Sequence, residues 1–300
     1  MALRRRAAYL QCMRIARLAL LVLSSSFALT ACGGATSSSL PGGAQAPSQD
    51  DTSAKIAAAL AGPARTAAER ARDVHRHPAE TLAFFGLRDD MSVVELAPGG
   101  GWYTAVLAPV LRDRGKLTVT TYDPNGPADD EATRDARALA DRFAKAPDAF
   151  GKVQTALVGG GRPLVLGPDG SADMVVTFRN VHNWIGGGRL GVVLAAVHRV
   201  LKPGGILGVE DHRANAGGPT DAKTIDSTGY VPQAYVVEQI EAAGFKLVGT
   251  SEVNANPRDT KDYPKGVWTL PPTYELGDTD RAKYAAIGES DRMTLKFVKR

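Results

Sequence analysis

The feature that most constrains this chain is a short apolar run that ends in a glycine-rich turn. Residues 93–96, Val-Val-Glu-Leu, read as a strand buried in a sheet, and the segment from Tyr103 onward reads as a helix. The turn between them consists of Ala97, Pro98, Gly99, Gly100, Gly101 and Trp102. Glycines allow a ligand to approach the backbone closely, and they tolerate turn angles that side chains disfavour. The segment therefore predicts an α/β fold with a ligand site at the end of a strand.

Strand-like and helix-like segments alternate along the rest of the chain. Strands are expected at residues 92–96, 117–122, 153–158, 174–177 and 206–210, with helices at 103–113, 130–145 and 189–201. A helix at 231–243, a segment at 245–253 and a final strand at 293–298 follow. This alternation demands parallel strands joined by crossover helices. We expect a Rossmann-like, doubly wound, mostly parallel seven-stranded sheet with helices on both faces.

Two further regions flank this pattern. Helical segments are expected around residues 56–60 and up to Val74, with a break at Gly62-Pro63 and an end near residues 75–78. An excursion from Asn254 to Ser290 is rich in Tyr, Trp and Asp and is too long for an ordinary connection. It is predicted to be a lid or a binding surface, and the alternatives are a loop that contacts a partner or a passive wrap over the sheet.

The end of the second strand carries an acid, Asp123, where a carboxylate can hydrogen-bond a ribose diol. With this acid, residues 95–101 resemble motif I of class I S-adenosylmethionine-dependent methyltransferases. Residues 173–180 match the family's fourth strand and its exit loop, and residues 199–205 match the turn before its fifth strand. In order and spacing, these blocks cover the chain from about Ala79 to its C-terminus.

The resemblance implies S-adenosylmethionine as the cofactor and an unidentified, small-molecule methyl acceptor. The cofactor-binding residues that it implies are Glu95, Ala97, Pro98, Gly99, Gly100, Gly101, Asp123, Arg179 and Asn180. One departure is that Tyr103 stands at about the place of the usual third glycine of motif I. The pattern of residues 98–104 is similar to predicted bacterial methyltransferases of unassigned substrate, several of which carry signal peptides. The resemblance thus narrows the fold and leaves the reaction open.

Two other interpretations of the glycine turn remain. A nicotinamide-binding Rossmann domain would carry the wider Gly-x-Gly-x-x-Gly spacing, which residues 99–101 lack. The Leu-Lys-Pro-Gly-Gly turn at 201–205 is also typical of methyltransferases and not of dehydrogenases. The remaining alternative is a coincidence of glycines in an unrelated α/β fold.

Candidate catalytic residues follow the fourth and fifth strands, since ligands in such folds bind at the carboxyl ends of the strands. These candidates are His182, Asp211 and His212. Methyl transfer is an in-line displacement, and an acceptor that holds a proton needs a base, a task that histidine suits near neutral pH. A structural hydrogen-bonded cluster around His212 and a packing role for His182 are the alternatives.

The other histidines have weaker claims. His198 is expected at the surface of a helix, and His75 and His77 have no further ligand at a recognisable spacing. No metal site is therefore predicted.

The first thirty-one residues read as a targeting segment. Five arginines between Arg4 and Arg17 precede an apolar run, Leu18–Leu29, that falls short of the about 20 residues that a spanning helix needs. Residues 29–32, Leu-Thr-Ala-Cys, look like a lipoprotein lipobox, in which Cys32 is acylated; an ordinary signal peptide is the alternative. We expect a signal peptide at 1–31, a flexible tether at 32–51 and the domain at 52–300. The protein would be exported and lipid-anchored on the periplasmic face, by analogy at the outer membrane.

Charge and compartment limit the partners. Loss of residues 1–31 removes five of the 36 Lys and Arg residues and none of the 32 Asp and Glu residues, so the high isoelectric point belongs to the targeting segment. A nucleic-acid partner is therefore not expected.

Export also separates the domain from an assured supply of the cofactor, unless it is exported already folded with the cofactor bound. The alternative function is an exported lipoprotein binding module with a repurposed methyltransferase fold. The sequence carries no signal for the oligomeric state.

Overall fold

The computed structural model of the protein describes residues 49–300. The predicted signal peptide, Cys32 and all but the last three residues of the expected tether lie outside the described residues. Helix α1 (Gln49–Ala61) begins inside the expected tether. It belongs to the domain, since its residues Ile56 and Ala59 are buried in the core. None of the helices that the structure describes combines the length and the apolar character that crossing a membrane requires.

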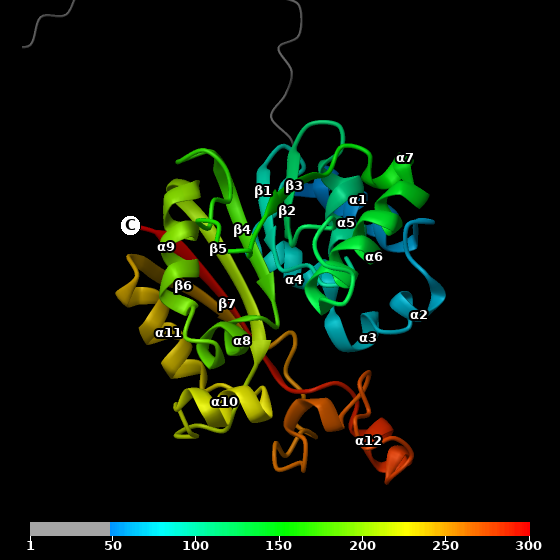
Figure 1. The fold of residues 1–300 in the computed structure, drawn as a ribbon, viewed down its shortest axis with the longest axis vertical. Coiled ribbons are helices and arrows are strands. Elements are labelled where there is room, and N and C mark those ends of the chain that lie inside the picture. Colours follow the sequence, from blue (N-terminus) through cyan, green and yellow to red (C-terminus); the bar gives the residue numbers. More distant parts are fainter. Residues whose placement is uncertain (1–48) are drawn as a thin grey trace, which may run out of the picture. The chain divides into compact units, whose positions relative to one another are not determined.

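Seven strands form one sheet in the order β3-β2-β1-β4-β5-β7-β6 (Figure 1). They are β1 (Ser92–Leu96), β2 (Lys116–Thr121), β3 (Gln154–Leu157), β4 (Ala172–Phe178), β5 (Leu201–His212), β6 (Phe245–Ser251) and β7 (Arg292–Lys299). The first five in this order are parallel, whereas β7 runs antiparallel to both β5 and β6. The predicted seven-stranded, mostly parallel sheet is confirmed. The chain winds outward from β1 and then returns to place β4 beside it, and the ends of β1 and β4 form the switch point where such folds bind ligands.

Both faces of the sheet are covered, as the residue alternation along each strand requires. Val93 and Met174 pack on one face with residues of α1, α4 (Pro78–Phe85), α5 (Thr104–Leu111), α6 (Glu131–Lys145) and α7 (Pro147–Phe150). Their neighbours Val94 and Val175 pack on the other face. The helices there are α8 (Val181–Gly186), α9 (Leu190–Val200), α10 (Ala222–Thr228) and α11 (Gln233–Ala242).

The segment before β1 is more broken than the sequence indicates. The expected second helix is split into α2 (Ala67–Arg70) and α3 (Asp73–Arg76), and α4 follows at once. Thr66 caps α2 in a reciprocal box with Glu69. His77 has a left-handed backbone with φ of 38°, and Pro78 then starts α4, where its missing N–H is no loss. This sharp turn directs α3 toward the carboxyl ends of the strands.

The excursion between β6 and β7, hereafter the 254–290 segment, contains the 3-10 helix η1 (Gly266–Thr269) and α12 (Arg281–Ile287). Its start is held by Asn254, whose amide donates to Thr81 and Thr294 at 2.9 Å. Its end is held by Asp291, which pairs with Arg213 at 2.9 Å and with Lys261 at 2.8 Å. The segment is therefore fastened at its base beside the carboxyl end of the sheet.

Candidate functional site

The glycine turn after β1 exposes bare backbone. Ala97, Gly99 and Gly101 have left-handed backbones with φ of 47°, 55° and 78°. A Cβ added at Gly99 or Gly100 would meet nothing within 4 Å, so the protein leaves the space above both residues open. Ala97 adopts its unusual angle without a glycine, and its N–H donates to Thr120 Oγ1 at 2.7 Å. The turn thus has the form of a cradle for a ligand.

Glu95 lies behind this turn and is 1% exposed. Its carboxylate accepts a hydrogen bond from Thr104 Oγ1 at 2.6 Å. Burial raises the pKa of Glu95 to about 7, and the hydrogen bond from Thr104 and the charge of Arg142 oppose that rise. The side chain is therefore poised to change its charge near neutral pH.

Two cavities border the turn, with volumes of about 450 Å³ and 390 Å³. We call them the large and the small cavity. They share five lining residues, which are Ala97, Pro98, Gly99, Asn180 and Asn183. Asn180 joins the ends of β1 and β4, because its amide lies 3.2 Å from Ala97 O and 3.1 Å from Phe178 O. A ligand on the glycine turn would reach into both cavities.

The small cavity is a mostly apolar slot beside the end of β2. Its wall includes the side chains of Tyr122, Leu139, Val158, Leu164 and Leu166. Such a slot suits a flat, uncharged ring.

Asp123, the predicted ribose ligand, lines neither of these cavities. It follows Tyr122 at the mouth of the small cavity, and its carboxylate accepts from Arg162 Nη2 at 3.0 Å and from the N–H of Asn125 at 2.9 Å. These two hydrogen bonds lower the pKa of Asp123. Contact with a ribose would require Arg162 to release it.

The three predicted catalytic residues come together beside the large cavity: His182 and His212 line it, and Asp211 is buried behind them. His182 Nδ1 lies 2.7 Å from Asp211 Oδ1, and the His182 N–H donates to Asp211 Oδ2 at 2.8 Å. The His182 and His212 rings are 5.1 Å apart, and His212 Nδ1 lies 2.6 Å from Ser290 Oγ. Because Asp211 engages Nδ1 of His182, the nitrogen left for a ligand is Nε2. A carboxylate that orients a histidine in this way equips it to accept a proton.

These same three residues offer one potential metal ligand atom each, all within 4.8 Å of one another. Burial, followed by the charges of His182 and Arg179, lowers the pKa of His212 well below its ordinary value. The positive surroundings that disfavour a proton on His212 also disfavour a cation beside it. His212 is therefore uncharged near neutral pH.

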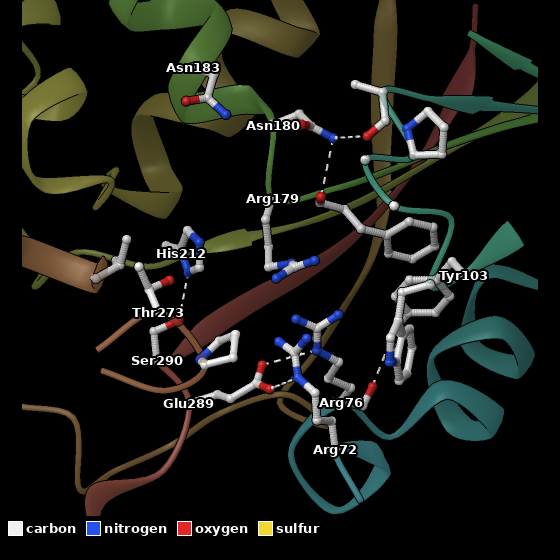
Figure 2. A pocket seen from close by; sticks show the side chains of 18 of the residues that line it. Arg72, Arg76, Tyr103, Arg179, Asn180, Asn183, His212, Thr273, Glu289 and Ser290 are labelled. Atoms are coloured by element: carbon white, nitrogen blue, oxygen red, sulfur yellow. Dashed lines mark hydrogen bonds and ion pairs between the residues drawn. The ribbon is translucent and has the colours of Figure 1, made fainter. Parts of the chain in front are cut away.

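Next to Ser290, the large cavity holds a cluster of buried charges around Glu289 (Figure 2). Glu289 accepts from Arg72 Nε at 2.7 Å and from Arg76 Nε at 3.0 Å, and Arg292 lies 3.2 Å from it. Burial alone would raise the pKa of Glu289, but the charges of Arg76, Arg292 and Arg72 outweigh it and lower the pKa to about 2. Glu289 is therefore ionised at neutral pH.

The floor of the cluster lies against the end of β5. Arg292 Nη1 pairs with Glu210 Oε1 at 3.1 Å, and the Tyr103 hydroxyl donates to Glu210 Oε2 at 3.1 Å. The Tyr103 ring stacks on Phe178 with centroids 3.5 Å apart. Tyr103, which replaces the third glycine of motif I, thus forms part of the cavity wall.

The sequence predicted the site residues at the strand ends and did not predict several other residues that line the large cavity. The missed residues are Arg72, Arg76, Trp102, Trp268, Thr273, Glu289 and Ser290. Arg72 and Arg76 are four positions apart on a helical segment. Arginines on the exposed face of a helix often have this spacing, so the sequence alone does not mark these two as site residues. The 254–290 segment was expected as a lid or binding surface, and it does supply residues to the large cavity.

Comparison with known proteins agrees with this geometry. Residues 94–209 match the family described as methyltransferase domain. No curated protein matches the sequence significantly. A SAM-dependent methyltransferase from Aquifex aeolicus is similar in structure, with a TM-score of 0.51 and 17% identity over 83% of this chain and 98% of that one. The [4+2]-cyclase SpnF is similar with a TM-score of 0.54 and 18% identity over 83% of this chain and 93% of that one. At these identities the likeness shows the fold, and the predicted fold is confirmed.

Proposed function

We propose that the chain, whose residues 94–209 match a methyltransferase domain and whose fold is that of a class I methyltransferase, transfers a methyl group from S-adenosylmethionine to a small-molecule acceptor in the large cavity. The observation that carries the proposal is the position of the His182–Asp211 pair. His182, whose ring Asp211 engages, lines the same cavity as the open backbone of the glycine turn. A cofactor cradle and a proton acceptor therefore face one space.

The residues around the turn fit S-adenosylmethionine. The bare backbone of Gly99 and Gly100 leaves room for the methionine part, and the apolar small cavity suits the adenine ring. Glu95 lies behind the turn, and Asn180 reaches the turn from the end of β4. Asp123 would hold the ribose once Arg162 has moved away from it.

When bound, S-adenosylmethionine supplies a methyl group on a sulfonium: an acceptor lone pair forms the new bond to carbon as the carbon–sulfur bond breaks and its electron pair stays on sulfur. His182 Nε2 accepts the proton that the acceptor gives up, and Asp211 stabilises the imidazolium that results. His212 stays neutral and, with Ser290, can hold the acceptor by hydrogen bonds. Trp268 and Thr273 of the 254–290 segment exclude water from this space.

The test is isothermal titration of the purified full-length protein with S-adenosylhomocysteine. Gly100→Val fills the open space without straining the backbone, because Gly100 has no left-handed angle and an added Cβ meets nothing. We expect this variant to keep the wild-type melting temperature and to lose binding. The control is Gly191→Val, which places the same side chain in open space on α9, away from both cavities.

A well-folded protein that does not bind the nucleoside would overturn the methyltransferase proposal. The second candidate, an exported binding module on this fold, would then take its place. Its ligand would have to be sought among molecules that fit the large cavity.

We propose separately that the protein is exported and anchored by lipid on Cys32 at the periplasmic face of the envelope. The support is the sequence of residues 1–32 alone. Mass spectrometry of the membrane fraction should find an acylated Cys32, and Cys32→Ala should move the protein out of that fraction. Wild-type protein that is found unacylated would contradict the anchor and would leave the enzymatic proposal untouched.

A further inference from the structure

The cluster around Glu289 contains guanidinium N–H donors that have no hydrogen-bond partner among the described residues. Arg76 is 1% exposed, and its Nη1 and Nη2 have no hydrogen-bond partner; the same holds for Arg72 Nη2 and Arg179 Nε. Arg179 makes no side-chain hydrogen bond or ion pair with the described residues. Buried donors without partners are costly and rare in native proteins. They indicate that a ligand completes this end of the cavity.

The side chains come from separate parts of the fold and converge on one place (Figure 2). Arg72 and Arg76 come from the segment around α3, and Arg179 follows β4. Arg179 has a left-handed backbone with φ of 64°, which is uncommon outside glycine. A non-glycine residue held at such an angle is a frequent mark of a functional site.

The local charge is unbalanced. Among the residues that the structure describes, the guanidiniums of Arg72, Arg76, Arg179 and Arg292 face two carboxylates around this space, those of Glu210 and Glu289. Burial, and after it the charge of Arg179, lowers the pKa of Arg76 to about 9.

The other acids of the cavity wall do not relieve this imbalance, because each is engaged elsewhere. Glu69 pairs with Arg142 at 2.6 Å, and Glu95 is hydrogen-bonded to Thr104 behind the turn. Asp211, buried behind the wall, is paired with His182. An anion is therefore the ligand that this end of the cavity lacks.

We propose that Arg72, Arg76 and Arg179 form a subsite for an anionic group, a carboxylate or a phosphate, of the methyl acceptor. This inference rests on the proposed function. Guanidinium groups recognise both anions through paired N–H donors. An anion held here would orient the acceptor with its reactive atom toward His182, which lines the same cavity.

The carboxylate of the cofactor is also an anion that these arginines could bind. The directions of two neighbouring side chains favour the acceptor as the source of the anion. Asn180 turns its amide toward Ala97 on the glycine turn, whereas Arg179 points away from the turn, toward Arg76 (Figure 2). Glu289, which holds Arg72 and Arg76 in place, belongs to the 254–290 segment and not to the strand ends that form the turn. The subsite is thus built on the acceptor side of the cavity.

The experiment is isothermal titration of the full-length protein with inorganic phosphate, with and without saturating S-adenosylhomocysteine. The main variant is Arg179→Gln, which removes a charge that has no protein partner and should therefore fold normally. We expect phosphate to bind in both conditions and Arg179→Gln to weaken its binding by about tenfold or more. Because the resemblance to class I methyltransferases implied Arg179 as a cofactor-binding residue, S-adenosylhomocysteine is titrated as well, and its affinity should fall by much less than that of phosphate. Arg134→Gln, an exposed arginine on α6 outside both cavities, is the control.

Three outcomes would overturn the subsite. The first is no phosphate binding by the folded protein, and the second is binding that Arg179→Gln leaves unchanged. The third is competition of phosphate with S-adenosylhomocysteine but not with 5′-methylthioadenosine, which lacks the carboxylate; the arginines would then hold the cofactor. Phosphate binding that depends on Arg179 in a protein that binds no nucleoside would instead refute the methyltransferase function and leave an anion-binding site.

Discussion

The two ends of the large cavity are built in different ways. The cofactor end is made of backbone: a glycine turn directly after β1, closed by Asn180 from the neighbouring strand β4. The arginine end is made of long charged side chains drawn from residues 72–76, 179 and 289–292. A backbone site depends on a few consecutive residues, whereas a side-chain site depends on the tertiary fold. The first end can therefore be recognised in a sequence, and the second can be found only in a structure.

The His182–Asp211 pair lies between the two ends, and its loss has the largest expected effect. His182→Ala should lower methyl transfer by about 10²- to 10⁴-fold, because no group remains to accept the proton. S-adenosylhomocysteine release with a pool of anionic metabolites as acceptors would measure this. His198→Ala, on α9 with its ring against Phe245, should have no effect. Equal turnover by the wild type and His182→Ala across the pH range would place the base elsewhere.

The arginine end should depend strongly on its central carboxylate. Glu289→Gln should lower the free energy of unfolding by about 3–5 kcal/mol, because it leaves Arg72, Arg76 and Arg292 buried without their shared partner. Glu252→Gln is the control, since the Glu252 side chain is 66% exposed and its pair with Arg213 should contribute at most about 1 kcal/mol. Urea denaturation of both variants would show the contrast, and similar losses would refute it.

The two ends should also differ in how pH affects their stability. The pKa of Glu95 is raised from 4.5 to about 7, so folding takes up a proton between these values. The free energy of unfolding should fall by about 3 kcal/mol as pH rises through this window, and Glu95→Gln should abolish that part of the slope. Glu289, with its pKa lowered to about 2, acts in the opposite sense: the stability it contributes is present above pH 4.5 and is lost as pH falls toward 2.

Denaturation curves from pH 2 to pH 8 would test this contrast in one experiment. Parallel pH profiles for the wild type and Glu95→Gln between pH 4.5 and 7 would contradict the role of burial at the cofactor end. A Glu289→Gln profile that still follows the wild type below pH 4.5 would contradict the ion pairing at the arginine end.

The smallest expected effect concerns the rim of the cofactor end. Asp123→Asn should weaken S-adenosylhomocysteine binding by about tenfold, because a hydrogen-bonded ribose loses a charged acceptor. Arg162→Ala should bind at least as tightly as the wild type, since it frees Asp123 from its present partner. Titration of both variants distinguishes the roles, and weaker binding in Arg162→Ala would show that the pair itself is needed.

Much of the fold could be predicted because local patterns determine it. The apolar strands and the helices at 130–145 and 189–201 were placed within a few residues, since each buries a continuous apolar face. The helices α4, α10 and α12 were not predicted. They are seven or eight residues long, and α4 depends on the left-handed His77 before it, which no periodicity announces.

The candidate site divides in the same way. His182, Asp211 and His212 were named because they follow strands β4 and β5, and parallel strands end at a common edge. Arg72 and Arg76 could not be predicted as site residues. The turn at His77 and the hydrogen bonds to Glu289 bring them to that edge, and both are features of the tertiary structure. Asp123 was expected to bind the ligand, and in the structure its exposed carboxylate accepts a hydrogen bond from Arg162. The two residues are 39 positions apart, so no local pattern indicates this pair.

The fastened base of the 254–290 segment has a consequence for how this protein can diverge. The segment leaves the sheet at β6 and returns at β7, and its ends are clasped by Asn254 and Asp291. Exposed residues between these clasps can be exchanged or lengthened without disturbing the strands, whereas the buried Glu289 is fixed by its arginines. Descendants of one ancestor could therefore acquire new acceptors by rewriting this segment alone, while the glycine turn that serves the cofactor is inherited unchanged.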